Sequence, residues 1–350
     1  MGIAAARRRR RSVVGLVPPL AIRDQRQKRN ARLLAGVFIL LALGGCASLV
    51  PQTKELGRAL PAGLPARVEL TETPFFPQTE YQCGPAALAT VLAAGGASVT
   101  PQELVPQVYL PARKGSLQVE MLAAARRHGM VSYQLAPRYE DLLREIAAGT
   151  PVIVLQNLGF FSSGWHYAVA VGYDYGPGTL VLRSGTLERD VIPFATHELV
   201  WMRSGYWAMV AVPPDRIPIT AEEKSWLGAV AALERVGDAR TARVAYRTFL
   251  ARWPDNVNAH VGLANAYHAL GELGEAEAVL REAARKDPDS VVVLNNLAQT
   301  LSDLGRDKEA LPIIERALAA GGPFAGAAQK TRDAIVGKLR SERSGVERLQ

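Results

Sequence analysis

A repeat of 34 residues near the C-terminus constrains the fold of this chain more than any other feature. Pro254 and Pro288 are 34 positions apart, and glycines, alanines and large side chains recur at the same interval. The recurring positions are Gly237, Gly271 and Gly305; Ala242, Ala276 and Ala310; Trp226, His260 and Leu294; and Leu233, Tyr267 and Leu301. A unit this short cannot bury its apolar face alone, so we expect the units to stack into a helical solenoid.

This pattern resembles tetratricopeptide repeats, in which paired helices cross at a small residue, turn at a glycine and end at a proline. We expect three such repeats over residues 223–324, a linker over 214–222, and a capping helix and tail over 325–350. The resemblance implies an all-α solenoid whose concave groove binds a protein partner.

The first 45 residues are strongly basic and then apolar. They hold ten of the Lys and Arg residues and one acid, so they account for the formal net charge of +8 and leave the rest of the chain close to neutral. The charge therefore gives no indication of nucleic-acid binding. The apolar run "LLAGVFILLALGG" over 33–45 is short for a membrane span and typical of the core of a signal peptide.

The sequence "LGGCAS" around Cys46 resembles a bacterial lipobox. The resemblance implies that a signal peptide over 1–45 is removed and that the thiol of Cys46 carries a lipid; the alternative is an uncleaved anchor with an incidental cysteine. Ala47 follows where an Asp would favour the inner membrane, which implies lipid anchoring in the outer membrane, facing the periplasm. Residues 46–67 are rich in Pro, Gly and Ala, and we expect a tether there.

Residues 68–213 show the pattern of an α+β domain. Helices are predicted over "GPAALATVLAAGG", which follows Cys83, and over 100–109, 116–129 and 139–149. Strands rich in β-branched and aromatic residues are predicted over 151–157, 165–174, 179–185 and 206–213. Helices first and strands later favour an antiparallel sheet covered by helices.

Cys83 is the main candidate for chemistry in this domain. If Cys46 is lipidated, Cys83 has no partner in the chain, and an exported unpaired thiol must be buried or used. A helix N-terminus lowers the pKa of a thiol, so we expect a reactive Cys83. His166, at the start of a strand, is the best candidate for its base, whereas His197 is expected in a polar loop. A packed cysteine and a core histidine are the alternative interpretation.

The stretch "PQTEYQCGPAALATVL", followed by "HYAVAVGYD", resembles the papain-like cysteine peptidases of the bacteriocin-processing type, which cut leader peptides after a double glycine. The resemblance implies a papain-like fold over 68–213, with Cys83 as nucleophile and His166 as base. It also implies a glutamine that binds the oxyanion. The family position six residues before the cysteine holds Pro77, so we expect Gln78 in this role, with Gln82 as a weaker alternative.

The residue that orients the histidine departs from the family pattern. The place of the family's aspartate holds Ser184, which accepts an imidazole N–H without charge. Asp174, Asp190 and Asn157 remain alternatives.

These features predict a membrane-anchored cysteine peptidase whose repeats recruit a substrate or partner protein. One alternative is a catalytically inactive peptidase-like adaptor that binds peptides. Another is an amidase or acyltransferase that uses the same dyad on a non-peptide substrate. The sequence has no metal-ligand spacing and no phosphate-binding glycine loop, so we expect no metal, no cofactor and no nucleic acid.

Overall fold

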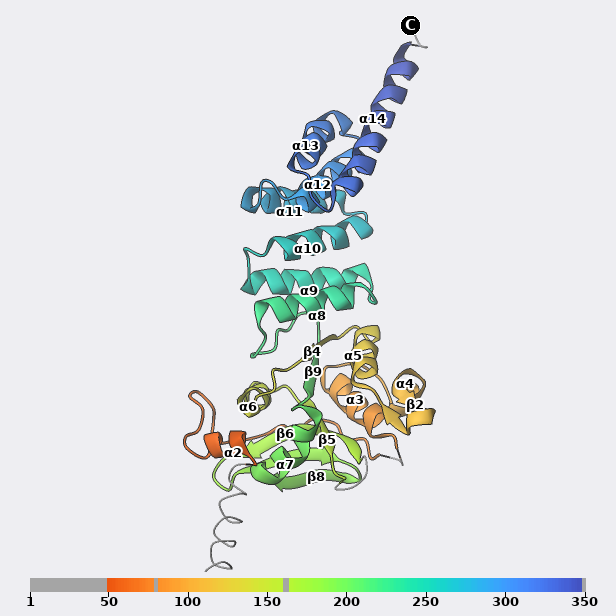
Figure 1. Ribbon diagram of the computed structural model, residues 1–350. Coiled ribbons are helices and arrows are strands. Elements are labelled where there is room, and N and C mark those ends of the chain that lie inside the picture. The colour runs from red at the N-terminus through yellow and green to blue at the C-terminus, as the bar shows by residue number, and fades with distance from the viewer. Residues whose placement is uncertain (1–48, 79–80, 160–163, 348–350) are drawn as a thin grey trace, which may run out of the picture. The chain divides into compact units, whose positions relative to one another are not determined.

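The computed structural model describes residues 49–78, 81–159 and 164–347 (Figure 1). The described residues from Gln52 onward belong to one compact unit. The predicted signal peptide and Cys46 lie outside the described residues. Within the described ranges, no helix combines the length and the apolar character that crossing a bilayer requires.

A seven-stranded antiparallel sheet forms the centre of the first domain. Its strand order is β4-β9-β5-β6-β7-β8, with β1 beside β6. The strands are β1 (Arg67–Glu69), β4 (Val131–Gln134), β5 (Val152–Asn157), β6 (Trp165–Asp174), β7 (Thr179–Ser184), β8 (Leu187–Pro193) and β9 (Ala208–Val212). A separate short hairpin joins β2 (Tyr109–Leu110) to β3 (Gly115–Ser116). The predicted α+β class and the antiparallel sheet are confirmed.

Side chains alternate between the two faces of the sheet along each strand, and the central strands carry buried apolar residues on both faces. Helices therefore cover both faces. One face packs against α3 (Cys83–Ala94), α4 (Pro101–Val108) and α5 (Gln118–Arg127), and the other against α6 (Tyr139–Ala147) and α7 (Phe194–Trp201) (Figure 1). The helix α3 is small or apolar along its whole length and is buried from Gly84 to Leu92. Cys83 is therefore the N-terminal residue of a helix that is packed in the core.

Several helices begin or end at residues that commonly cap a helix. Thr100 caps α4 through a reciprocal pair with Glu103, and Pro101 occupies the first turn. Gly129 and Gly149 adopt positive φ angles of 76° and 83° just beyond α5 and α6, a conformation that glycine enters without strain.

The structure corrects the predicted tether over 46–67. A short helix, α2 (Pro51–Leu56), begins this segment, and the Leu56 side chain is buried in the core. The backbone N–H of Gln52 donates to Glu198 Oε1 over 2.9 Å, and β1 pairs with β6. Apolar burial and these hydrogen bonds hold residues 52–69 against the α+β domain, so any free tether ends before Gln52.

One polar segment was assigned wrongly and one strand was not predicted. His197 lies in α7 rather than in a loop; it is fully buried, and its Nδ1 is 3.0 Å from the hydroxyl of Tyr139. Asp190 lies past the end of β7 as expected, but in a further strand, β8, that the sequence analysis did not predict. The strand β8 is an edge strand and is largely exposed, so its sequence lacks the apolar pattern that marks a buried strand.

The repeats form three helix pairs followed by a longer helix, as predicted (Figure 1). The helices are α8 (Glu223–Glu234), α9 (Ala239–Arg252), α10 (Val257–Ala269), α11 (Leu273–Lys286), α12 (Val291–Asp303), α13 (Asp307–Ala320) and α14 (Ala325–Glu347). Ala242, Ala276 and Ala310 are all at most 1% exposed, because the paired helices cross at these small residues. Gly271 and Gly305 make the turns with φ angles of 75° and 74°.

Candidate active site

Cys83 is the first residue of α3 and lines a cavity of about 650 Å³. Ser116, Trp165 and Tyr167 line the same cavity. The next residue is a glycine for a steric reason: a Cβ at Gly84 would lie 2.3 Å from Ser116 Oγ. The hairpin of β2 and β3 therefore packs directly against the backbone beside the thiol.

The environment of Cys83 favours the uncharged thiol. Burial raises the pKa of Cys83, although the backbone N–H groups of Tyr167, Gly84 and Cys83 itself favour the thiolate. The expectation that the helix N-terminus lowers this pKa is therefore corrected, because desolvation outweighs the amide groups.

His166 is the second residue of β6, and its Nε2 lies 3.0 Å from the hydroxyl oxygen of Ser184 at the end of β7. Burial lowers the pKa of His166, while the negative charge of Asp190 acts in the opposite direction. The imidazole is therefore neutral at neutral pH, and one of its nitrogens is held by a hydroxyl group.

The other three candidates for orienting His166 form no hydrogen bond with it, although Asp190 acts on it through its charge. Asp174 ends β6 eight residues further on, roughly 26 Å away at strand spacing, and lies 3.8 Å from Arg67 Nε. Asn157 Oδ1 accepts hydrogen bonds from two backbone N–H groups, those of Gly159 and Gly164. Of the four residues considered, the structure brings Ser184 alone into hydrogen-bond contact with the imidazole.

Gln78 lies beside the same strand ends. Its backbone N–H donates to the carbonyl oxygen of Gly185 over 3.0 Å, and its Nε2 donates to the carbonyl oxygen of Tyr167 over 3.4 Å. The thiol of Cys83 meets the backbone N–H of Tyr167, which follows His166 in the chain. Tyr167 thus brings the three predicted residues together, although the described hydrogen bonds include none between Cys83 and His166 themselves.

Gln82, the weaker candidate for the oxyanion position, is the N-cap residue of α3. Its carbonyl oxygen accepts the backbone N–H of Ala86, so its backbone serves the first helical turn.

Gln156 is a polar residue near His166 that the sequence analysis missed. It pairs directly with His166 across β5 and β6, is 2% exposed, and its Nε2 has no hydrogen-bond partner among the described residues. Paired residues of antiparallel strands point to the same face. The sequence signal that could have identified Gln156 is its position as a polar residue at the end of the apolar run "PVIVLQN".

Comparisons with known proteins agree with these two parts. Residues 70–209 match the model of the Peptidase C39 like family, and residues 227–291 and 273–330 match two tetratricopeptide-repeat models. A search of curated proteins found no match.

Solved structures also resemble parts of the chain. A putative C39-like peptidase from Bacillus anthracis is 18% identical over 42% of this chain and 97% of its own, with a TM-score of 0.36. A double glycine motif protease from an AMS/PCAT transporter, solved with its leader peptide, is 22% identical over 41% of this chain and 93% of its own (TM-score 0.34). A thermophilic tetratricopeptide-repeat protein of Thermus thermophilus is 19% identical over 34% of this chain and 66% of its own (TM-score 0.31).

The family matches and the strand and helix order lead to one conclusion: residues 70–209 form a Peptidase C39-like domain, and residues 227–330 form tetratricopeptide repeats.

Proposed function

We propose that this protein is a lipid-anchored cysteine peptidase in which Cys83 is the nucleophile and His166 is the base. The observation that carries the proposal is the convergence at the start of β6. There, Tyr167 meets the Cys83 thiol and the Gln78 amide, and its neighbour His166 is held by Ser184. A nucleophile, a base, an amide donor and a cavity are the parts that thiol-dependent acyl transfer needs.

The resting pair is a thiol and a neutral imidazole. Burial raises the pKa of Cys83 and lowers that of His166, so both environments oppose a preformed ion pair. We assign the Nε2 proton of His166 to its hydrogen bond with Ser184, which leaves Nδ1 as the acceptor for the thiol proton. His166 then acts as a general base during the attack.

Attack forms a bond between the sulfur of Cys83 and the substrate carbonyl carbon while the thiol proton moves to His166. The Nε2 group of Gln78 and the backbone N–H of Cys83 stabilise the oxyanion. The hydrogen bond from Gln78 to Tyr167 is 3.4 Å long, which makes it a weak one that a developing anion replaces readily. His166 returns the proton to the leaving amine, and water then releases the acyl group with His166 again as base.

Recruitment and anchoring complete the proposal. The tetratricopeptide repeats support protein binding, of either the substrate or a partner. Lipidation of Cys46 would hold the chain at the outer membrane, facing the periplasm. This part of the proposal rests on the lipobox-like sequence around Cys46.

A second function, a peptide-binding adaptor without activity, is favoured by two observations. Ser184 supplies no negative charge to stabilise a protonated His166, and burial raises the pKa of Cys83. The cavity beside Cys83 would then bind a peptide without cutting it.

The experiment is complementation of a deletion strain, followed by comparison of protein N-termini between strains. The wild-type chain should restore the missing cleavage products, while Cys83→Ala and His166→Ala should not. His128→Ala is the matched control, because His128 lies at the end of α5 and contacts Gln107 instead of the cavity. If Cys83→Ala restores every product, the peptidase is refuted and the adaptor remains.

A further inference from the structure

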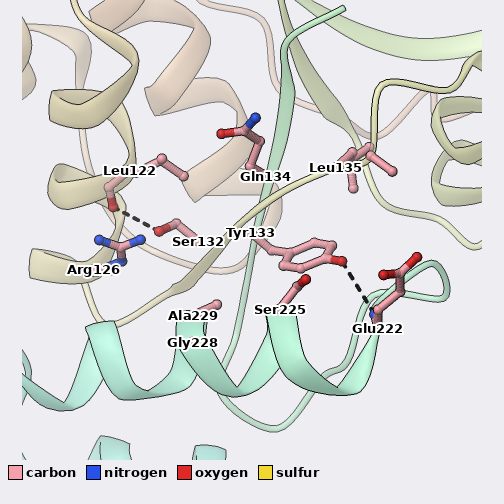
Figure 2. Close-up of a pocket in the computed structure, with 11 residues that line it drawn as sticks. Leu122, Arg126, Ser132, Tyr133, Gln134, Leu135, Glu222, Ser225, Gly228 and Ala229 are labelled. Atoms are coloured by element: carbon pink, nitrogen blue, oxygen red, sulfur yellow. Dashed lines mark hydrogen bonds between the residues drawn. The ribbon is translucent and has the colours of Figure 1, made fainter.

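A second cavity, of about 390 Å³, lies between the peptidase domain and α8 (Figure 2). Leu122 and Arg126 of α5 and Gln134 of β4 line one side, and Ser225 and Gly228 of α8 line the other. It shares no lining residue with the cavity beside Cys83. Its chemistry is therefore independent of the proposed peptidase.

Arg126 places an unpaired positive charge at this cavity. Its side chain is half-buried, its Nε is buried without an acceptor, and it forms no ion pair or hydrogen bond with any residue of the described ranges. The adjacent Arg127, by contrast, donates to the side chain and backbone of Gln107. Arg235 adds a second positive charge nearby, which disfavours the charged form of Arg126 further. A guanidinium that is partly removed from water normally has an anionic partner.

The acid that lines the cavity does not neutralise Arg126. The Glu222 carboxylate lies 3.7 Å from Arg138, and its backbone N–H donates to the hydroxyl of Tyr133. Figure 2 shows Glu222 beside Tyr133, at the opposite end of the cavity from Arg126. The nearby hydroxyl of Ser132 donates instead to the Leu122 carbonyl over 2.9 Å. One end of the cavity thus remains positively charged.

We propose that this cavity binds the carboxylate of a small ligand at Arg126, with the apolar part of the ligand against Leu122 and Ala229. Arginine pairs with a carboxylate through two parallel N–H donors, which compensates both its charge and its lost hydration. The volume lies in the lower part of the range for small-ligand pockets, about 300–1,000 Å³. Two sources fit this chemistry, the C-terminal carboxylate of a short peptide and a free organic acid.

The test is calorimetric titration of the purified full chain in detergent with three probes: acetyl-alanyl-leucine, its C-terminal amide, and acetate. The free acid should bind, and the amide should bind at least about tenfold more weakly, since it cannot form a charge-assisted pair. Arg126→Met should weaken binding of the acid by about 10- to 100-fold. Tighter binding of the peptide than of acetate identifies a peptide end as the source, and equal affinity identifies a small acid.

Two matched controls separate the site from general effects. Arg247→Met removes the same charge from an exposed position of α9 and should leave binding unchanged. Gly228→Leu should fill the cavity, since a Cβ there meets no atom within 4 Å, and Gly274→Leu makes the same change on an equally open position of α11. Gly228→Leu should abolish binding of the acid, and Gly274→Leu should leave it unchanged.

Thermal unfolding without a ligand shows whether Arg126→Met still folds. Removal of an unpaired, half-buried charge should leave the melting temperature equal or higher, as at binding sites that trade stability for function. The proposal is overturned if no acid binds, if acid and amide bind equally, or if Arg126→Met and Gly228→Leu both bind like the wild type.

Discussion

Replacement of Gly84 by alanine should destabilise the peptidase domain where α3 begins. A Cβ at this position would lie 2.3 Å from Ser116 Oγ, 2.6 Å from Ser116 Cβ and 3.3 Å from Met121 Sδ. A change of the Ser116 rotamer moves the Oγ but not the Cβ, so the backbone of β3 or α3 must also shift.

The size of the effect follows from two opposing contributions. Exchange of glycine for alanine in a helix ordinarily stabilises by about 0.5–1 kcal/mol. Overpacking costs about 1–3 kcal/mol. The new Cβ would meet the Cβ of Ser116, which cannot move without the backbone, so we expect the cost of Gly84→Ala at the upper end of this range. The free energy of unfolding should therefore fall by about 2 kcal/mol. With a slope of about 2 kcal/mol per molar urea, the midpoint should drop by about 1 M.

The assay is urea unfolding followed by tryptophan fluorescence. Gly228→Ala is the matched control, because a Cβ there meets open space, and its midpoint should stay or rise. The double variant Gly84→Ala/Ser116→Gly removes both close atoms and should recover most of the loss relative to Ser116→Gly alone. An unchanged or higher midpoint for Gly84→Ala would refute the packing argument.

Three further predictions concern other sites. Ser184→Ala should slow acylation of Cys83 about 3- to 10-fold, the value of one neutral hydrogen bond, while Ser184→Asp should speed it; equal rates in stopped-flow acylation would exclude Ser184 from this role. Burial lowers the pKa of His197 to about 3. As the pH falls, the imidazole of His197 is therefore protonated in the unfolded chain before it is protonated in the folded one. Stability should then fall by up to about 1.4 kcal/mol per pH unit from roughly pH 6.5 to 3, and His197→Phe should flatten that slope in pH-dependent unfolding. Cys46→Ala should abolish labelling of the chain by radioactive palmitate and release it from the membrane fraction; persistent labelling would place the lipid elsewhere.

The parts of the fold that the sequence predicted best are those with local or repeated signals. A period of 34 residues defined the repeats, because every unit places the same small and large side chains at the same helix crossings. The order of Gln78, Cys83 and His166 also identified residues that meet around Tyr167. Cys83 and His166 stand at the starts of a helix and a strand, where the backbone fixes their position.

The features that the sequence did not predict depend on contacts between distant segments. His197 occurs in a polar stretch, but it is buried where it contacts Tyr139 and Trp201. The pKa of Cys83 depends on a balance between amide groups, which are visible in the sequence, and burial, which is not. Nothing in the sequence around Arg126 indicates that α8 lies across from it and encloses a cavity.

The most direct test of the central claim is the rate at which a peptide nitrophenyl ester acylates Cys83, measured by stopped flow and confirmed by mass. If His166 is the general base, His166→Ala should slow acylation by about 10²- to 10⁴-fold, and the His128→Ala control should not. The wild-type rate should hold down to about pH 6.5, the ordinary pKa of histidine, and fall only at lower pH, because burial lowers the pKa of His166. Equal rates in the wild type and His166→Ala, or no acylation of Cys83 in either, would contradict the proposed dyad.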